Sequence, residues 1–134
     1  MSLPVALDTN LLVRLLTNDD PGQARRVAEL IEASPACFVP ITVVLELEWV
    51  LRGAYRLPRE AIIRALRGLI SIRQLHLEQE EQVLQALDWY AQGLDFADAL
   101  HLLRSEGCSA LFSFNRALSR QAGALSLSPP VREP

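Results

Sequence analysis

Residues 3–16 read LPVALDTNLLVRLL, and the change from an apolar run to a polar turn and then to helical periodicity within this stretch decides the fold class. An apolar run over residues 3–7 is typical of a short buried strand. The run ends at Asp8, Thr9 and Asn10, which are residue types that favour turns and helix N-caps. Apolar residues then recur at helical spacing as far as residue 17. The stretch therefore predicts a core strand that leads through a polar turn directly into a helix.

The same alternation of strands and helices continues along the chain. Apolar runs bounded by turn residues predict further strands at residues 36–39, 72–77, 110–114 and 124–127. Periodic segments with proline, glycine or capping residues at their ends predict helices at residues 21–33, 40–51, 58–69, 78–91, 95–105 and 115–121. Strands separated by helices need crossover connections, which favour a parallel sheet covered on both faces. We expect one three-layer α/β domain over residues 1–134, with a parallel sheet of four or five strands and a loose tail at residues 128–134.

From the composition we expect this domain to be cytoplasmic. The chain has 134 residues, half of them apolar, which is enough to build a core without disulfides or a structural metal. Cys37 and Cys108 fit no metal-binding spacing, and we expect both to be buried thiols in a reducing compartment. The N-terminal residues lack the basic region of a signal peptide, and no apolar stretch approaches the roughly 18 residues of a membrane span.

The basic residues are informative because all 13 are arginine and none is lysine. A P-loop needs a lysine on the phosphates, and a Schiff-base enzyme needs an amine. Phosphoacceptor domains of the receiver or haloacid-dehalogenase type generally also use a lysine. The composition therefore disfavours all three classes.

Oxygen-bearing side chains follow the predicted strands in a pattern that suggests a site. Asp8 follows the first strand, Asn115 follows the fourth, and Glu46 lies on the helix after the second. Asp95 and Asp98 are three residues apart and share a face of the first turn of another helix. Ligands of parallel α/β sheets gather outside the carboxyl ends of the strands, so these five side chains are expected to converge.

Clustered carboxylates repel one another, and a divalent cation would relieve that repulsion. Oxygen ligands without histidine or cysteine suit Mg²⁺ or Mn²⁺, which can activate water against a phosphodiester. Each residue has a plainer explanation: Asp8 and Asp95 as helix caps, Glu46 as part of a solvated helix face. His101 lies close enough to Asp98 to face the site, and a surface position on its helix is the alternative.

Four segments resemble the motifs of PIN-domain ribonucleases, most closely toxins of the VapC type. They are LDTNLLVRLL (residues 7–16), FVPITVVLELEWVL (residues 38–51), GLDFADALHL (residues 93–102) and SFNRAL (residues 113–118). Together they extend over nearly the whole chain, in the order and at the distances of that family.

The resemblance implies a Mg²⁺- or Mn²⁺-dependent endoribonuclease that is usually a homodimer and is held inactive by a cognate antitoxin. Carried over by position, Asp8, Glu46 and Asp98 are the acidic metal-site residues, and Asp95 is an additional acidic neighbour. Thr9 or Asn10 would support Asp8 through hydrogen bonds. The family's fourth position is typically aspartate, and Asn115 replaces it here, which removes a negative charge and keeps one amide oxygen for a metal.

A basic segment is the candidate RNA surface. Six arginines and a single glutamate lie between residues 52 and 73, and we assign RNA contacts to Arg52, Arg56 and Arg59. A solvated helix face is the alternative. Without the acids Asp8, Glu46, Asp95 and Asp98, the formal charge of −3 becomes +1, so the overall acidity does not argue against an RNA substrate.

Two other functions remain open at this stage. Asn115 is compatible with a catalytically weakened PIN module that binds RNA or an antitoxin without efficient cleavage. The same metal chemistry would also serve a DNA nuclease. An apolar groove for an antitoxin is a further expectation, with the core as the alternative location of its residues: Leu11, Leu12, Leu15, Trp49 and Leu51.

Overall fold

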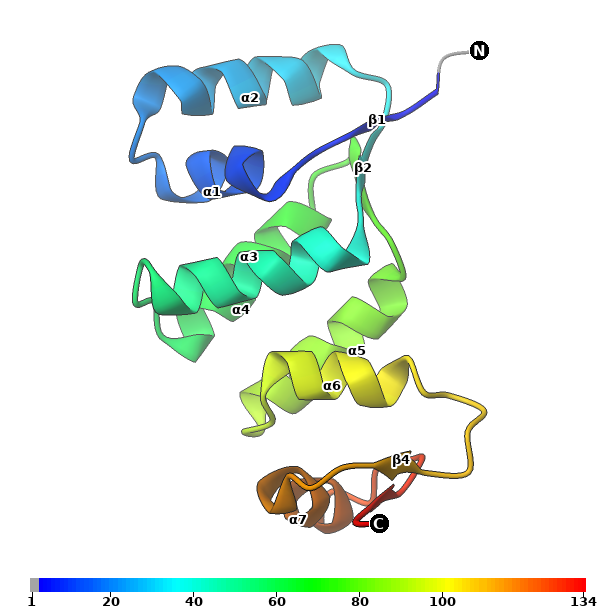
Figure 1. Ribbon diagram of the computed structural model, residues 1–134. Helices are drawn as coiled ribbons and strands as arrows, with labels where there is room; N and C mark the ends of the chain where they lie inside the picture. Colours follow the sequence, from blue (N-terminus) through cyan, green and yellow to red (C-terminus); the bar gives the residue numbers. More distant parts are fainter. Residues whose placement is uncertain (1–2) are drawn as a thin grey trace. The chain divides into compact units, whose positions relative to one another are not determined.

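The computed structural model describes residues 3–134 as seven helices and five short strands, all of which pair in parallel (Figure 1). The predicted α/β class with parallel strands is confirmed. By contacts, the chain divides into two compact units, Met1–Glu80 and Glu81–Pro134. Within residues 3–134, no helix is both long enough and apolar enough to cross a membrane.

A three-stranded parallel sheet organises the first unit. Its strands are β1 (Val5–Ala6), β2 (Cys37–Val39) and β3 (Leu75–Leu77), in the order β1-β2-β3. Alternate residues of β2 and β3 are buried, as is typical of a sheet with one face on a core. The pairing of β1 with β2 aligns Ala6 with Phe38, so the chain leaves both strands at the same edge of the sheet.

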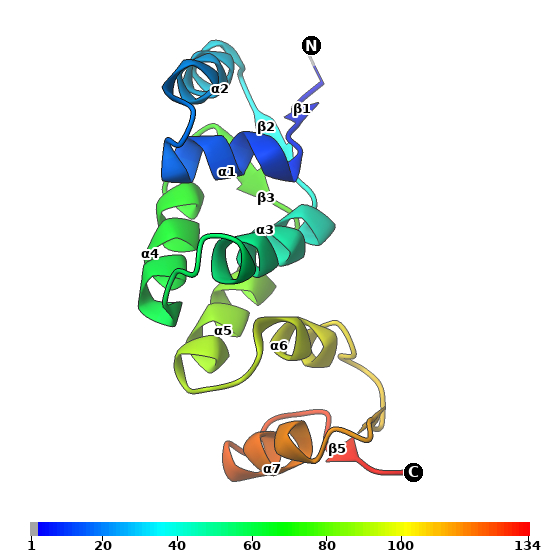
Figure 2. The same cartoon turned by 60° about the vertical axis from the view of Figure 1, so that its left-hand side comes forward.

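Four helices belong to the first unit: α1 (Thr9–Thr17), α2 (Pro21–Ala33), α3 (Ile41–Gly53) and α4 (Arg59–Ile70). Helix α1 lies against both α2 and α3, and α4 packs on α3 and β3 (Figures 1 and 2). Helix α2 begins as the sequence predicts, because the Asp20 carboxylate accepts a hydrogen bond from the Gln23 N–H at 3.1 Å and Pro21 occupies the first helical position.

Helix α3 shows how the core selects one helical face. Val44, Leu47 and Leu51 are at most 1% exposed, whereas Trp49 is 65% exposed. Glu48 is also buried, and Arg52 one turn later donates to it at 2.8 Å. A buried carboxylate needs such a partner, because an unpaired charge away from water is costly. The two glutamates of α3 therefore differ in role, since Glu46 is exposed.

The second unit contains α5 (Glu80–Ala91), α6 (Phe96–Leu103), β4 (Leu111–Phe112), α7 (Arg116–Ala124) and β5 (Val131–Arg132). Tyr90 and Phe96 are buried and meet edge to face, with ring centroids 5.6 Å apart. This geometry is favourable for aromatic pairs. It fixes the turn between α5 and α6, and that turn carries Asp95 to the start of α6.

Four details differ from the sequence prediction. The five strands form a three-stranded and a two-stranded sheet rather than one. Residues 124–127 form no strand, because α7 continues to Ala124 and the N–H of Leu127 then bonds to the Ala122 carbonyl; β5 lies instead within the expected tail and pairs with β4. Val5 is 39% exposed because β1 is an edge strand, and the Cys108 thiol is exposed.

Candidate active site

A cavity of about 380 Å³ in the first unit collects the polar residues that follow β1. Its acidic side chains are Asp8 and Glu46, and its walls come from α1, from α3 and from the segment after α3. The lining residues are Asp8, Thr9, Asn10, Val13, Arg14, Glu46, Val50, Ala54 and Tyr55.

Strand pairing and a single threonine bring the two acids together. The N–H of Leu7 bonds to the Phe38 carbonyl at 3.0 Å, so α1 and α3 both begin at the same edge of the sheet. Thr9 is buried, its N–H donates to Asp8 Oδ1 at 2.8 Å, and its hydroxyl donates to Glu46 Oε1. Thr9 therefore holds one oxygen of each carboxylate.

The other oxygen of each carboxylate has no such partner. Among the described residues of the first unit, Asp8 Oδ2 and Glu46 Oε2 accept no hydrogen bond, and no arginine pairs with either acid. Arg14 also lines the cavity, but its ion-pair partner is Asp19. Two neighbouring carboxylates that no arginine pairs with repel each other and favour binding of a cation. Carboxylate oxygens are the ligands that Mg²⁺ and Mn²⁺ prefer.

The rim of the cavity carries residues that sequence analysis missed. Tyr55 donates to Asp19 Oδ2 at 2.5 Å, and Arg14 Nη1 lies 3.4 Å from Asp19 Oδ1. The hydrogen bond from Tyr55, with smaller contributions from Thr17 and Arg14, lowers the pKa of Asp19. Arg14 lies one helical turn after Asn10, so spacing on α1 was a usable signal. Tyr55 gave no comparable signal, because its position depends on a contact between distant segments.

A second acidic cluster lies at the start of α6 in the second unit. Asp95 caps the helix and accepts from the N–H of Asp98 at 3.0 Å. Asn115 caps α7, where its Oδ1 accepts from the N–H of Leu118 at 3.1 Å. Its Nδ2 donates to Asp98 Oδ2 at 3.4 Å. The amide thus faces Asp98 with a donor, where an aspartate would add a repulsive charge.

The fold raises the pKa of Asp98, one of the two acids of this second cluster. Desolvation raises the pKa of Asp98, the charge of Asp95 raises it further, and His101 opposes both. Each effect has a direct cause, because burial and a like charge disfavour the ionised form and a nearby imidazolium favours it. A carboxyl group with a raised pKa beside a second acid is a candidate for a functional site.

The site residues expected from sequence divide between two clusters. Asp8, Thr9, Asn10 and Glu46 line one cavity, and Asp95, Asp98 and Asn115 are linked by hydrogen bonds around α6. The donor set of each cluster fits a hard divalent cation in chemical type. Within residues 3–134, no three histidine, cysteine or acidic side chains form a group that could hold a metal ion by themselves. Each cluster supplies two carboxylates.

Comparison with known proteins identifies the family. The model of the PIN domain matches residues 5–124, a range that includes both acidic clusters. The chain belongs to the PIN-domain family. No individual curated protein matches it. PIN domains are generally metal-dependent nucleases that act on RNA, so membership supports a hydrolase with a nucleic-acid substrate.

Because the pKa of Asp98 is raised, replacing Asp98 should change the free energy of unfolding of this PIN domain in a way that depends on pH. The folded state binds the Asp98 proton more tightly than the unfolded chain does, so stability is lost as pH rises from the ordinary carboxyl pKa through the raised one. With a chelator present, Asp98→Asn should therefore raise the free energy of unfolding at neutral pH, and the gain should shrink towards about pH 4.

Urea unfolding across this pH range measures the effect. Glu106→Gln is the matched control, because Glu106 is an exposed acid of the same unit. Its stability relative to wild type should vary little with pH. An Asp98→Asn protein that is less stable than wild type at neutral pH would contradict the electrostatic account.

Proposed function

We propose that this PIN domain is an endoribonuclease dependent on Mg²⁺ or Mn²⁺. Asp8, Glu46, Asp95 and Asp98 are its catalytic acids. The observation that carries the proposal is the cavity in which Thr9 orients Asp8 and Glu46 and leaves one oxygen of each without a hydrogen-bond partner among residues 3–134. On α6, Asp98 lies close to a second acid, Asp95, and its pKa is raised.

The protein's own contribution is to hold carboxylates and to position phosphate. By their match to the family's motifs, Asp8, Glu46 and Asp98 are proposed as metal-site residues, and Asn115 lies beside Asp98. When bound, such a cation lowers the pKa of a coordinated water and stabilises charge on the phosphodiester. Thr9 fixes the acids, Asn10 offers an amide at the cavity wall, and Arg14 supplies positive charge at the rim. This arrangement favours in-line attack on an RNA phosphate.

Loss of one acid or of the cation should remove cleavage. Asp8→Asn should lower the rate by more than about 100-fold, since residues that only support metal ligands already contribute 10- to 100-fold. Chelator should abolish cleavage by wild type, and added Mg²⁺ or Mn²⁺ should restore it. The measurement is gel-resolved cleavage of a structured RNA and of a single-stranded DNA.

Matched variants decide between the open alternatives in the same assay. Glu106→Gln should cleave as wild type does, and wild type should prefer RNA to DNA. RNA cleavage that survives both chelator and Asp8→Asn would exclude the metal mechanism. Efficient DNA cleavage would favour the DNA nuclease.

A second candidate function rests on Asn115. Its Oδ1 accepts from Leu118 and its Nδ2 faces Asp98, so the amide places no negative charge where the family typically has one. This favours a weakened module that binds RNA or an antitoxin without efficient cleavage. If Asn115→Asp cleaves RNA where wild type does not, this second function is correct.

Arginines beside the cavity are proposed to bind RNA phosphates. Ala54 and Tyr55 line the cavity, and Arg52 and Arg56 flank them in the chain. Arg52, Arg56 and Arg59 are all exposed, and the ion pair with buried Glu48 fixes the stem of Arg52. Position and charge therefore suit contacts to an RNA strand that enters the cavity.

Replacing Arg56 and Arg59 with alanine should weaken RNA binding and reduce the slope of its dependence on salt by about two. The control is a double alanine variant of Arg25 and Arg120, which removes equal charge from exposed positions elsewhere. Anisotropy of a labelled RNA in chelator gives both affinities. Equal losses in the two variants would show that only net charge matters.

We further propose that the nuclease is the toxin of a toxin-antitoxin pair and acts in the cytoplasm as a homodimer. Support comes from the four motifs shared with VapC-type toxins and from the exposed apolar side chain of Trp49, which suits a protein partner. The cognate antitoxin is the expected partner.

Induced expression in a bacterial host tests the toxin role. Wild type should arrest growth, Asp8→Asn should not, and co-expression of the protein encoded by the neighbouring gene should relieve the arrest. Equal growth of cells that express wild type and Asp8→Asn at equal levels would contradict it.

A further inference from the structure

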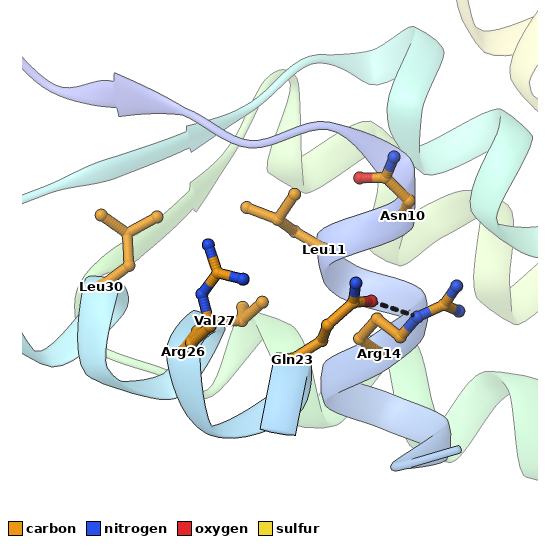
Figure 3. A pocket seen from close by; sticks show the side chains of 7 residues that line it. All are labelled: Asn10, Leu11, Arg14, Gln23, Arg26, Val27 and Leu30. Carbon is orange, nitrogen blue, oxygen red and sulfur yellow. Dashed lines mark hydrogen bonds between the residues drawn. The ribbon is translucent and has the colours of Figure 1, made fainter. Parts of the chain in front are cut away.

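A second cavity of the first unit lies between α1 and α2 and has no part in the chemistry described so far. Its volume is about 490 Å³, within the range of sites that bind small molecules. Figure 3 shows side chains from both helices around it, with Leu11 and Arg26 between the helices. The lining residues are Asn10, Leu11, Arg14, Gln23, Arg26, Val27 and Leu30.

The lining combines positive charge, amides and apolar surface. Arg14 and Arg26 bring two guanidinium groups, and no acidic side chain lines the cavity. Among the described residues of the first unit, no carboxylate lies within ion-pair distance of Arg26. Guanidinium groups bind phosphate through paired hydrogen bonds. The charge of the cavity therefore favours a phosphorylated ligand.

Arg14 is already oriented for such a ligand. Its Nε donates to Gln23 Oε1 at 2.7 Å, drawn in Figure 3, and its Nη1 lies 3.4 Å from Asp19 Oδ1. These two contacts fix the guanidinium plane and leave other N–H groups for an anion. A side chain held in advance loses less conformational entropy on binding.

The two cavities share two lining residues, Asn10 and Arg14. A nucleotide in the α1–α2 cavity would therefore share Asn10 and Arg14 with a phosphate at Asp8 and Glu46. Leu11, Val27 and the 39% exposed Leu30 offer an apolar wall for the face of a base. A nucleotide has this same combination of anion, polar sugar and apolar ring.

We propose that the cavity between α1 and α2 is a subsite for the nucleotide next to the scissile phosphate. Arg14 and Arg26 bind its phosphate, and Leu11, Val27 and Leu30 contact its base. The assignment rests on the proposed ribonuclease function and names the residues that hold the substrate beyond the acids. Shape and charge of this subsite then contribute to the choice of cleavage position.

The experiment compares two adjacent arginines of α2. Both arginines are exposed, but Arg26 lines the cavity and Arg25 does not. Binding of a short fluorescent single-stranded RNA in chelator is followed by anisotropy over a range of salt. Arg26→Gln should weaken binding about tenfold and lower the salt slope by about one, and Arg25→Gln should change the affinity less than about twofold. Leu30→Asn should weaken binding without a change in salt slope.

Equal effects of Arg25→Gln and Arg26→Gln, or no effect of either, would overturn the subsite. A separate assay compares wild type and Asp8→Asn in metal-dependent cleavage of the same RNA, and this assay tests the proposed ribonuclease function. Cleavage with no specific effect of Arg26→Gln rejects the subsite alone. A specific effect without cleavage keeps an RNA-binding cavity and rejects the nuclease.

Discussion

The hydrogen bond from the Thr9 hydroxyl to Glu46 is the interaction on which the candidate site depends. Parallel pairing of β1 and β2 starts α1 and α3 at one edge of the sheet, and this bond then fixes their polar ends together. Because the Thr9 N–H also donates to the carboxylate of the N-cap residue Asp8, one buried residue sets the orientation of both carboxylates. Among the described residues of the first unit, the second oxygen of each acid accepts no hydrogen bond, and carboxylate oxygens are the ligands that Mg²⁺ prefers.

In the second acidic cluster, as in the first, hydrogen bonds position a pair of carboxylates. Here one of the two carboxylates also raises the pKa of the other. Asp95 both caps α6 and repels Asp98, so a helix cap also raises the pKa of its neighbour. Asn115 donates a hydrogen bond to Asp98 Oδ2 at 3.4 Å, and His101 opposes the effect of Asp95. PIN domains are generally metal-dependent nucleases. An acid with a raised pKa beside a second acid is a candidate for such a site.

Local signals made much of this fold predictable. The pair Asp20 and Pro21 determines the start of α2, and the acids after β1 and at the start of α6 follow from strand ends and helix spacing. Contacts between segments that are distant in the sequence could not be predicted from it. The pairing of β4 with β5 and the bond between Tyr55 and Asp19 join residues that no periodicity relates. The apolar residues 124–127 predicted a strand, although their backbone closes the end of α7 instead.

Calorimetric titration of Mn²⁺ into metal-free protein tests the central claim most directly, with Thr9 as the variable. Wild type should bind the ion. Thr9→Val keeps the shape of the buried side chain and removes the hydroxyl that holds Glu46, so it should weaken binding about 10- to 100-fold. Thr9→Ser, which retains the hydroxyl, should bind nearly as wild type does. Equal affinities of wild type and Thr9→Val, or no binding by wild type, would contradict the account.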